Sequence, residues 1–340
     1  MSHPLGAVLH APQDLRTEPL EQPPVGPTDV LLDVEACGVC GSDLASYAHG
    51  HYVEPGQVMG HELSATVAEA GSALVGLEPG TRVAVRPMRS CGECAYCREG
   101  DTHLCGSTAG RSLGYGAQGA FAEQLHLPDV VVGRDVVPVP AGTDPFDLLW
   151  AEPLAVALHA VGLAAVGPGG HVLVTGAGAV GLTVTAAALA RDLTVHVVEP
   201  VEHRRDAAAR LGASVSAPGE ATGEATGEAT GAAAYDALLD ASGAPAAVTA
   251  ALPLLAPAAP VVLVGLNDAP VPWPVGAHRV TGSFGYVDGD FAAAVDLIVS
   301  GRVSLAGLVT HRYPLDQADR ALAAPRPEDH VVKAAVVPRA

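Results

Sequence analysis

The sequence has little positive charge and few aromatic side chains. Its 340 residues include 18 Lys and Arg against 37 Asp and Glu, so the formal net charge is −19 at pH 7, and aromatic residues make up only 4%. A chain this acidic is repelled by nucleic acid and by anionic membranes, which argues against both as partners. The acidity fits solubility, and it also fits a neutral or cationic small-molecule substrate.

A long apolar run is also missing. The longest apolar stretch, residues 171–190, is interrupted by Gly-Ala-Gly and falls short of an uninterrupted membrane span of roughly 20 residues. The first residues, MSHPLGAVLHAPQDLR, lack the basic start and continuous apolar core of a secretory signal. We therefore expect no transmembrane helix and a cytoplasmic location.

The length and the hydrophobic pattern predict two domains, because single cores stop growing well below 340 residues. The first 150 residues contain short apolar segments between Gly and Pro turns, which are typical of a β-rich domain. From residue 171 onward, apolar strands alternate with amphipathic helices, which indicates βαβ units and a parallel sheet. The expected strands are 30–35, 64–70, 82–86, 171–176, 194–199, 236–241 and 261–265, and the expected helices are 179–191 and 202–211.

The last part of the chain is expected to return to the first domain. It contains two helix-like segments, 290–300 and 314–324, and a terminal strand, 331–337. Between them, the tandem Gly-Glu-Ala-Thr repeat of residues 219–231 is too polar and glycine-rich to order itself, so we expect a flexible surface loop, with a lid as the alternative.

Four of the six cysteines form one cluster. The spacing C-x2-C-x2-C-x7-C lets a single loop wrap four thiolates around one metal ion. Zinc is the expected metal, and an iron–sulfur cluster is the main alternative. Four protein ligands leave no open position, so this site is expected to be structural. Its ligands are Cys91, Cys94, Cys97 and Cys105.

The other two cysteines lie in Cys37-Gly-Val-Cys40-Gly-Ser42-Asp43, which is followed about twenty residues later by Gly60-His61-Glu62. A thiolate, an imidazole and a carboxylate from these segments can bind a second metal ion. A CxxC pair alone could equally be a redox pair, and His61 alone could be a core histidine.

These two segments and the four-cysteine loop, in this order, resemble the zinc-dependent medium-chain dehydrogenase/reductase family over essentially the whole chain. The resemblance implies an α/β protein with a GroES-like β-rich catalytic domain, residues 1–150 and 284–340, and an inserted Rossmann domain, residues 151–283. It also implies that Cys40 and His61 bind a catalytic zinc, whereas Cys37 serves packing.

The segment Ala151-Glu152-Pro153-Leu154 resembles the sorbitol dehydrogenase branch of that family. The resemblance implies that Glu62 and Glu152 complete the catalytic zinc shell, one directly and the other through water, and it does not rank them. A zinc ion with an open position lowers the pKa of a bound alcohol oxygen, which prepares the alcohol for hydride loss. Ser42 is expected to accept the substrate hydroxyl's hydrogen bond, and Asp43 to orient His61.

One departure concerns the proton. Many relatives carry a histidine five residues after the zinc cysteine, and this chain has Ala45 there. The proton is expected to leave through a zinc-bound water with Glu62 or Glu152, or through His49 or His51, which are equally compatible with simple exposure on a loop.

The expected cofactor site begins with Gly176-Ala177-Gly178-Ala179-Val180-Gly181, between a strand and a helix. This context predicts that Gly176, Gly178, Val180 and Gly181 bind a dinucleotide. Glu199, at the end of the next strand, would accept the ribose hydroxyls and repel a 2′-phosphate, which favours NAD over NADP.

Basic residues near this site leave room for an alternative. Arg204, or its neighbour Arg205, could hold a 2′-phosphate, although both are expected on the helix after Glu199. Lys333 is the only lysine and stands where relatives place a basic residue near the pyrophosphate.

Together, the resemblance implies an enzyme with NAD and two zinc ions per chain, which oxidises a secondary alcohol of a polyol, cyclitol, sugar or amino sugar to a ketone. Residues 41–45 and 152–158 resemble the 2-deoxy-scyllo-inosamine dehydrogenase type of aminoglycoside biosynthesis. A threonine or butanediol dehydrogenase of the same family, and a non-catalytic zinc- or nucleotide-binding protein, are the alternatives. A homodimer or homotetramer is expected.

Overall fold

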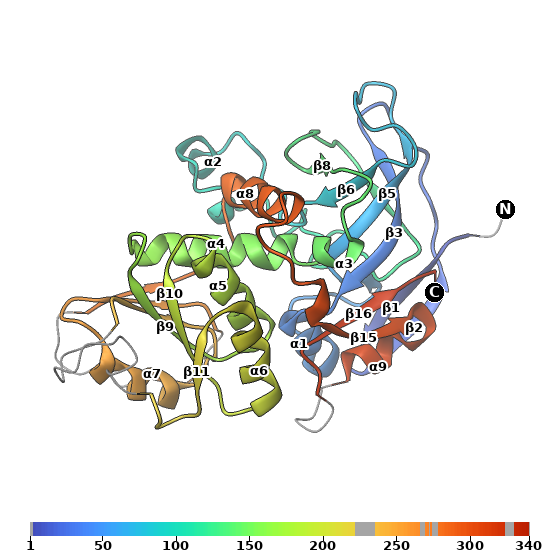
Figure 1. Ribbon diagram of the computed structural model, residues 1–340. Helices are drawn as coiled ribbons and strands as arrows, with labels where there is room; N and C mark the ends of the chain where they lie inside the picture. Colours follow the sequence, from blue (N-terminus) through green and yellow to red (C-terminus); the bar gives the residue numbers. More distant parts are fainter. Residues whose placement is uncertain are drawn as a thin grey trace. The chain divides into compact units, whose positions relative to one another are not determined.

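The structure, a computed structural model, describes residues 3–221, 235–265, 269–271, 273, 278–323 and 330–339. Residues 222–231, which make up most of the tandem repeat, lie outside the described residues, so the predicted flexibility of this loop stays a prediction. The chain divides into two units, Met1–Glu152 with Val287–Ala340, and Pro153–Tyr286 (Figure 1).

The first unit is built around strand β3 (Val30–Gly38), which pairs antiparallel with three other strands. Its seven-stranded sheet has the order β15-β16-β3-β5-β6-β8, with β7 also paired to β3. The last two strands of the chain thus join the sheet that the first 150 residues build. The remaining strands of this sheet are β5 (Glu62–Ala70), β6 (Arg82–Val85), β7 (Gln124–Leu127), β8 (Val136–Pro138), β15 (Val309–Pro314) and β16 (Lys333–Val337).

A second sheet of the first unit has three strands in the order β2-β1-β4, with antiparallel pairing throughout. Its strands are β1 (Leu5–Ala11), β2 (Asp14–Pro19) and β4 (Gln57–Val58).

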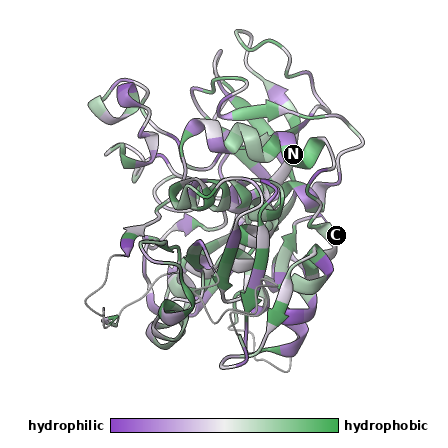
Figure 2. Cartoon of the chain, turned by 60° about the vertical axis from the view of Figure 1, so that its left-hand side comes forward, coloured by the Kyte–Doolittle hydropathy of each residue, from purple (hydrophilic) through white to green (hydrophobic). Residues whose placement is uncertain are grey.

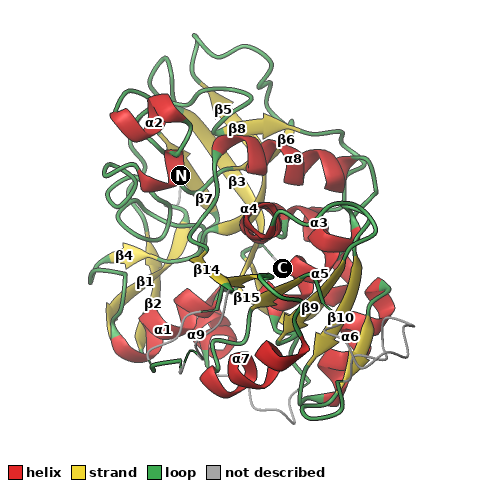
Figure 3. Cartoon of the chain, turned by 90° about the vertical axis from the view of Figure 1, so that its left-hand side faces the viewer, coloured by secondary structure: helices red, strands yellow, loops and turns green. Residues whose placement is uncertain are grey.

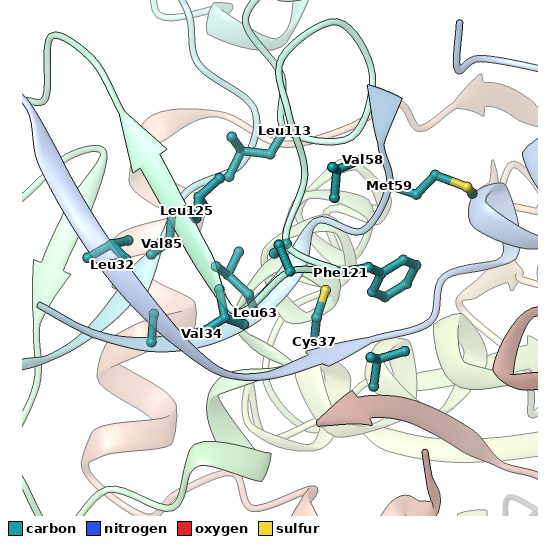
Figure 4. Close-up of a cluster of buried hydrophobic side chains, with 14 of the residues drawn as sticks. Leu32, Val34, Cys37, Val58, Met59, Leu63, Val85, Leu113, Phe121 and Leu125 are labelled. Atoms are coloured by element: carbon teal, nitrogen blue, oxygen red, sulfur yellow. The ribbon is translucent and has the colours of Figure 1, made fainter. Parts of the chain in front are cut away.

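Alternation of side chains creates the core of the first unit. Along β3, Val30, Leu32 and Val34 are buried and their neighbours are partly exposed, which is the period-two pattern of a half-buried strand. Figure 4 shows Leu32 and Val34 with side chains of other segments, among them Leu63 and Phe121. The apolar residues of consecutive strands therefore meet on one face.

The helices of the first unit are short and end at recognisable caps. Helix α3 (Pro145–Leu148) begins after Asp144, whose carboxylate accepts a hydrogen bond from Phe146 N at 2.8 Å, and α1 (Gly41–His49) ends at Gly50 in the left-handed region. Helix α3 packs against β3, β5 and α8. Figure 3 shows α3 and α8 among the helices of the chain. The other helices are α2 (Ala95–Glu99), α8 (Asp288–Val299) and α9 (Ala318–Leu322).

The second unit holds a six-stranded parallel sheet in the order β11-β10-β9-β12-β13-β14. Its strands are β9 (His171–Thr175), β10 (Thr194–Val198), β11 (Ser214–Ser216), β12 (Ala237–Asp240), β13 (Pro260–Leu263) and β14 (Arg279–Gly282). The central strands are apolar runs, as expected for a parallel sheet covered on both faces.

Helices alternate with these strands. Helix α5 packs against β9 and β10, α6 against β10 and β11, and α7 against β9 (Figure 1). In Figure 2, green hydrophobic colouring covers much of the central strands and helices, while purple hydrophilic segments are frequent in loops. The helices are α5 (Ala179–Leu189), α6 (Glu202–Leu211) and α7 (Pro245–Ala251), and α4 (Ala151–Ala164) begins just before the unit.

The predicted α/β class, a GroES-like β-rich part with a Rossmann-type sheet, is confirmed. The helix expected over 202–211 has those bounds, whereas the segment 314–324 differs: Pro314 ends β15, and α9 occupies only Ala318–Leu322 of the described residues. Pro314 is the N-cap of a 3-10 turn, Leu315–Gln317, which leads into α9, so only the part of the expected helix after Gln317 is α-helical. Among the described residues, no helix is both long and apolar enough to cross a membrane.

Candidate functional site

The predicted catalytic residues come together through the register of β3 and β5. Gly38, at the end of β3, pairs with Glu62, at the start of β5, so Cys40 follows one strand where His61 precedes the other. Asp43 Oδ2 accepts a hydrogen bond from Cys40 N at 2.9 Å, which holds the turn between β3 and α1. The pairing of β3 with β5 therefore brings the segments that carry Cys40 and His61 close together.

Three predicted zinc ligands form one cluster. Cys40, His61 and Glu62 each offer a ligand atom, and all three atoms lie within 4.8 Å of one another. His61 Nδ1 is buried and has no hydrogen-bond partner among the described residues. A thiolate, an imidazole and a carboxylate are the donors that zinc takes in catalytic sites, so the residues present fit the metal.

The cluster is strongly charged. Burial opposes a charge on His61, but Asp43 and Cys40 outweigh it and raise the pKa of the imidazole to about 10. Asp43 Oδ1 lies 3.7 Å from His61 Nδ1, which is an ion-pair distance and too long for the hydrogen bond that we expected between them. The other oxygen of Asp43 accepts the hydrogen bond of the Cys40 amide, so Asp43 holds the backbone of the turn that carries Cys40.

Lys333 lies in this cluster. Its ammonium pairs with Glu62 Oε2, and its charge stands 5.1 Å from the centre of the Trp150 ring. Burial disfavours the ammonium, but Glu62 raises the pKa of Lys333, so the lysine stays charged. The role of Lys333 towards a cofactor pyrophosphate stays a prediction; what the structure adds is its contact with Glu62.

Glu152 lies in the first turn of α4, where the charges of the cluster affect the pKa of its carboxyl group. Its desolvation, together with the charge of Glu62 and against that of His61, raises the pKa of Glu152 to about 7. It is not among the residues whose ligand atoms lie within 4.8 Å. Of the two glutamates, Glu62 alone joins Cys40 and His61 in this cluster of described residues, and direct coordination by either glutamate stays a prediction.

Ser42 and Cys37 have distinct surroundings. The Ser42 hydroxyl accepts a hydrogen bond from the Tyr115 hydroxyl, and the Tyr115 ring centre lies 4.9 Å from that of His61. The side chain of Cys37 is fully buried in the hydrophobic cluster beside Phe121 (Figure 4), and burial raises the pKa of its thiol well above the usual range. A thiol held neutral among apolar side chains suits packing.

The four-cysteine loop has the geometry of a closed thiolate site. Cys97 Sγ lies 3.9 Å from Cys91 Sγ and 3.5 Å from Cys94 Sγ, near the roughly 3.8 Å edge of a tetrahedron with bonds of about 2.3 Å. The amides of Glu93 and Cys94 donate to Cys91 Sγ and lower the pKa of its thiol. All four cysteines are free thiols and form one potential metal site, which fits structural zinc.

The same loop also lowers a second thiol pKa. Burial opposes ionisation of Cys105, but the backbone N–H groups of Cys91 and Ser107 outweigh it and bring the pKa to about 6. Cys105 N also closes the turn that begins at Thr102. Backbone amides thus favour the thiolate form of Cys91 and Cys105, whereas burial raises the pKa of Cys97 to about 11.

In the second unit, a cavity of about 720 Å³ lies at the start of α5 and is lined by Gly176, Gly178, Glu199, Arg204 and Ser242, among others. Gly176 has φ 90°, and a Cβ there would lie 3.0 Å from Ser242 Cα. A Cβ on Gly181 would lie 2.0 Å from the Gly176 carbonyl oxygen. The glycines thus allow the tight turn and the close packing that a dinucleotide site requires.

The carboxylate of Glu199 is buried and holds the turn between β9 and α5. Its Oε2 accepts from Ala177 N at 2.6 Å and its Oε1 from Val201 N at 2.9 Å. Arg205 donates to the carbonyl oxygens of Glu199 and Pro200, whereas Arg204 lines the cavity. Both arginines lie on α6, as expected.

Comparisons with known proteins agree with this geometry. Residues 26–141 match the alcohol dehydrogenase GroES-like domain, and residues 179–300 match the zinc-binding dehydrogenase model. D-xylulose reductase A of Aspergillus oryzae is 33% identical over 86% of this chain and 85% of its own, and sorbitol dehydrogenase of Bacillus subtilis is 29% identical over 93% and 92%. The chain belongs to the zinc-dependent medium-chain dehydrogenase family.

A solved relative shows that the likeness extends to the fold. The structure of 2R,3R-butanediol dehydrogenase from Bacillus subtilis covers 99% of this dehydrogenase and 100% of that chain, with a TM-score of 0.86 and 27% identity. The protein is therefore an oxidoreductase of the zinc alcohol dehydrogenase type that uses a nicotinamide dinucleotide, as the motifs implied.

Sequence reasoning missed two polar groups of this dehydrogenase. Asp240, 1% exposed at the end of β12, accepts hydrogen bonds from Thr175 Oγ1 at 2.7 Å and Ser242 Oγ at 2.6 Å, next to the Gly176 turn. Polar residues directly after a parallel strand are a usable signal for it. Tyr115 was also missed, and its glycine-rich surroundings carry no pattern that points to Ser42.

Proposed function

We propose that this dehydrogenase oxidises a secondary alcohol of a polyol, cyclitol, sugar or amino sugar to a ketone and transfers hydride to NAD. The observation that supports this most directly is the cluster of Cys40, His61 and Glu62, with Lys333 paired to the glutamate. A polyol-type assignment is further supported by the sorbitol and xylulose names of the relatives reported above.

Each residue of the catalytic cluster has a separate task. Cys40 and His61 would hold the metal ion, and Glu62 and Glu152 would complete its ligand shell. Zinc bound there supplies a Lewis acid that lowers the pKa of an alcohol oxygen. Ser42 accepts the hydrogen bond of the substrate hydroxyl and thereby orients the alcohol. The four-cysteine loop holds a second zinc ion that stabilises its own segment.

The residues of the cofactor cavity favour NAD. A carboxylate at Glu199 attracts ribose hydroxyls and repels a 2′-phosphate, and Arg204 is the residue that would hold such a phosphate. Comparing kcat/KM for NAD and NADP tests this directly. A higher kcat/KM for NADP would contradict the assignment, and loss of that activity in Arg204→Ala would explain why.

Assembly into a homodimer or homotetramer is part of the proposal. Strand β14 lies at the edge of the parallel sheet, and all four of its residues are exposed. An exposed edge offers unpaired backbone groups to a second copy. Light scattering coupled to size-exclusion chromatography measures the mass, and a monomer at all concentrations would contradict this part.

A substrate screen with zinc analysis tests the reaction. NADH formation is followed with sorbitol, xylitol, inositols, amino sugars and the aminocyclitols of aminoglycoside biosynthesis, and with threonine and butanediol for the alternative that the solved butanediol relative favours. We expect two zinc ions per chain and turnover on one polyol-like class. Turnover confined to threonine or butanediol would select the alternative, and zinc-loaded protein without any turnover would refute the enzyme proposal.

A further inference from the structure

The Ser42 hydroxyl and the Tyr115 hydroxyl form a hydrogen bond between two segments that are 73 residues apart in the sequence. Ser42 lies in the first turn of α1, two residues after Cys40. Ala45, three residues further along the same helix, offers Ser42 no polar atom. The partner of the serine hydroxyl is therefore supplied by a distant loop.

Backbone contacts fix the loop that carries Tyr115. Gly119 N donates to Val58 O at 2.8 Å, Ala120 N donates to Gly60 O at 2.8 Å, and a Cβ on Gly114 would lie 3.1 Å from Gly60 N. This segment is thus hydrogen-bonded to, and packed against, the residues directly before His61. This attachment places the Tyr115 ring beside the imidazole of His61, tilted by 44° to it, while the Tyr115 hydroxyl reaches Ser42.

A serine hydroxyl has one hydrogen and two lone pairs, and it rotates to suit its partners. When the Tyr115 hydroxyl donates to Ser42 Oγ, one lone pair is occupied and the rotation is restricted. The remaining lone pair and the serine hydrogen are then presented in a limited set of directions. Such preorganisation favours reaction because a substrate hydroxyl meets its partner already oriented.

We propose that Tyr115 is a positioning residue of the catalytic site, whose hydroxyl orients Ser42 towards the hydroxyl of the alcohol substrate. The proposal rests on the proposed function, because it assigns Ser42 the contact with substrate. Tyr115 acts through Ser42 and needs no contact with the reacting atoms.

The first test compares Tyr115→Phe with Tyr52→Phe. Phenylalanine keeps the ring beside His61 and removes only the hydroxyl. Tyr52 is a matched control, since its ring lies edge-on 6.4 Å from Tyr115 and its side chain is 56% exposed. For Tyr115→Phe we expect kcat to fall about tenfold, the effect of losing one hydrogen bond, with KM and zinc content unchanged. Tyr52→Phe should retain wild-type kcat.

A double-variant cycle separates positioning from packing. If Tyr115 acts through Ser42, then Tyr115→Phe causes no further loss of kcat in a Ser42→Ala background. Equal losses in both backgrounds would overturn the proposal, and so would a wild-type kcat for Tyr115→Phe alone. Absence of alcohol oxidation in the wild-type enzyme would instead refute the proposed function, so the two failures are distinguishable.

Discussion

Lys333 and Glu62 form an ion pair in which the side chains are only 1% and 3% exposed. Removing a charge from water is costly, so each partner is tolerated only because the other is present. The pair also ties the terminal strand β16 to the first residue of β5, beside the predicted zinc ligands. The only lysine of the chain thus has a structural task within the candidate site.

Replacing Lys333 should therefore lower the free energy of unfolding by more than the loss of its own contacts would. In the protein without bound zinc, Lys333→Met removes the ion-pair partner of the buried Glu62 carboxylate, and we expect the free energy of unfolding to fall by about 3–5 kcal/mol. Adding Glu62→Gln should recover part of that loss, because the unpaired charge is then gone. Urea denaturation of both variants measures the effect. A double variant less stable than Lys333→Met would contradict this account.

The two predicted zinc sites should respond differently to loss of a ligand. Cys97→Ser removes one of four thiolates from a closed site, so we expect loss of one zinc ion and a fall in the unfolding midpoint of more than about 5 °C. Cys40→Ser should abolish alcohol oxidation with little change in that midpoint. Elemental analysis and thermal unfolding read out both variants. The division would be wrong if both lost stability alike.

Two glycines at the start of α5 provide a matched pair of substitutions. A Cβ on Gly181 would lie 2.0 Å from the Gly176 carbonyl oxygen, whereas nothing lies within 4 Å of a Cβ on Gly178. We expect Gly181→Ala to disrupt the turn and weaken NADH binding at least tenfold, with a loss of stability typical of overpacking, about 1–3 kcal/mol. Gly178→Ala should keep wild-type stability. Fluorescence titration with NADH and urea denaturation compare them, and equal stability of the two variants would contradict the packing argument.

His196 should make the second unit sensitive to acid. It is held between Ser214 Oγ at 2.9 Å and Ser216 Oγ at 2.8 Å, and burial lowers the pKa of its imidazole from 6.5. Below pH 6.5 the unfolded chain binds a proton that the folded chain does not, so stability falls as the pH decreases. His196→Gln keeps an amide that can hydrogen-bond and does not titrate, so the variant should lose less stability between pH 7.5 and pH 5. An identical loss in both proteins would contradict the prediction.

Some features of this dehydrogenase are set by residues close together in the sequence. The bounds of α6 follow from helix-forming residues that end at Gly212, which adopts φ 108°. The four-cysteine loop closes within a few turns, because its spacing alone allows the thiolates to converge. The glycine-rich turn between β9 and α5 is likewise local, since Gly176 and Gly181 approach each other within this one turn.

The sequence by itself therefore determined the family, the fold class and the residue types of both candidate metal sites. Only the tertiary structure decided that Lys333 pairs with Glu62, that Tyr115 donates a hydrogen bond to Ser42, and that Asp43 hydrogen-bonds the Cys40 amide while it lies at ion-pair distance from His61. The first two contacts join segments far apart in the chain, and no local periodicity encodes which distant side chains meet. The third depends on a difference of less than about 1 Å in where a carboxylate comes to rest, since a hydrogen bond needs an N···O distance of about 3 Å. Packing decides such differences.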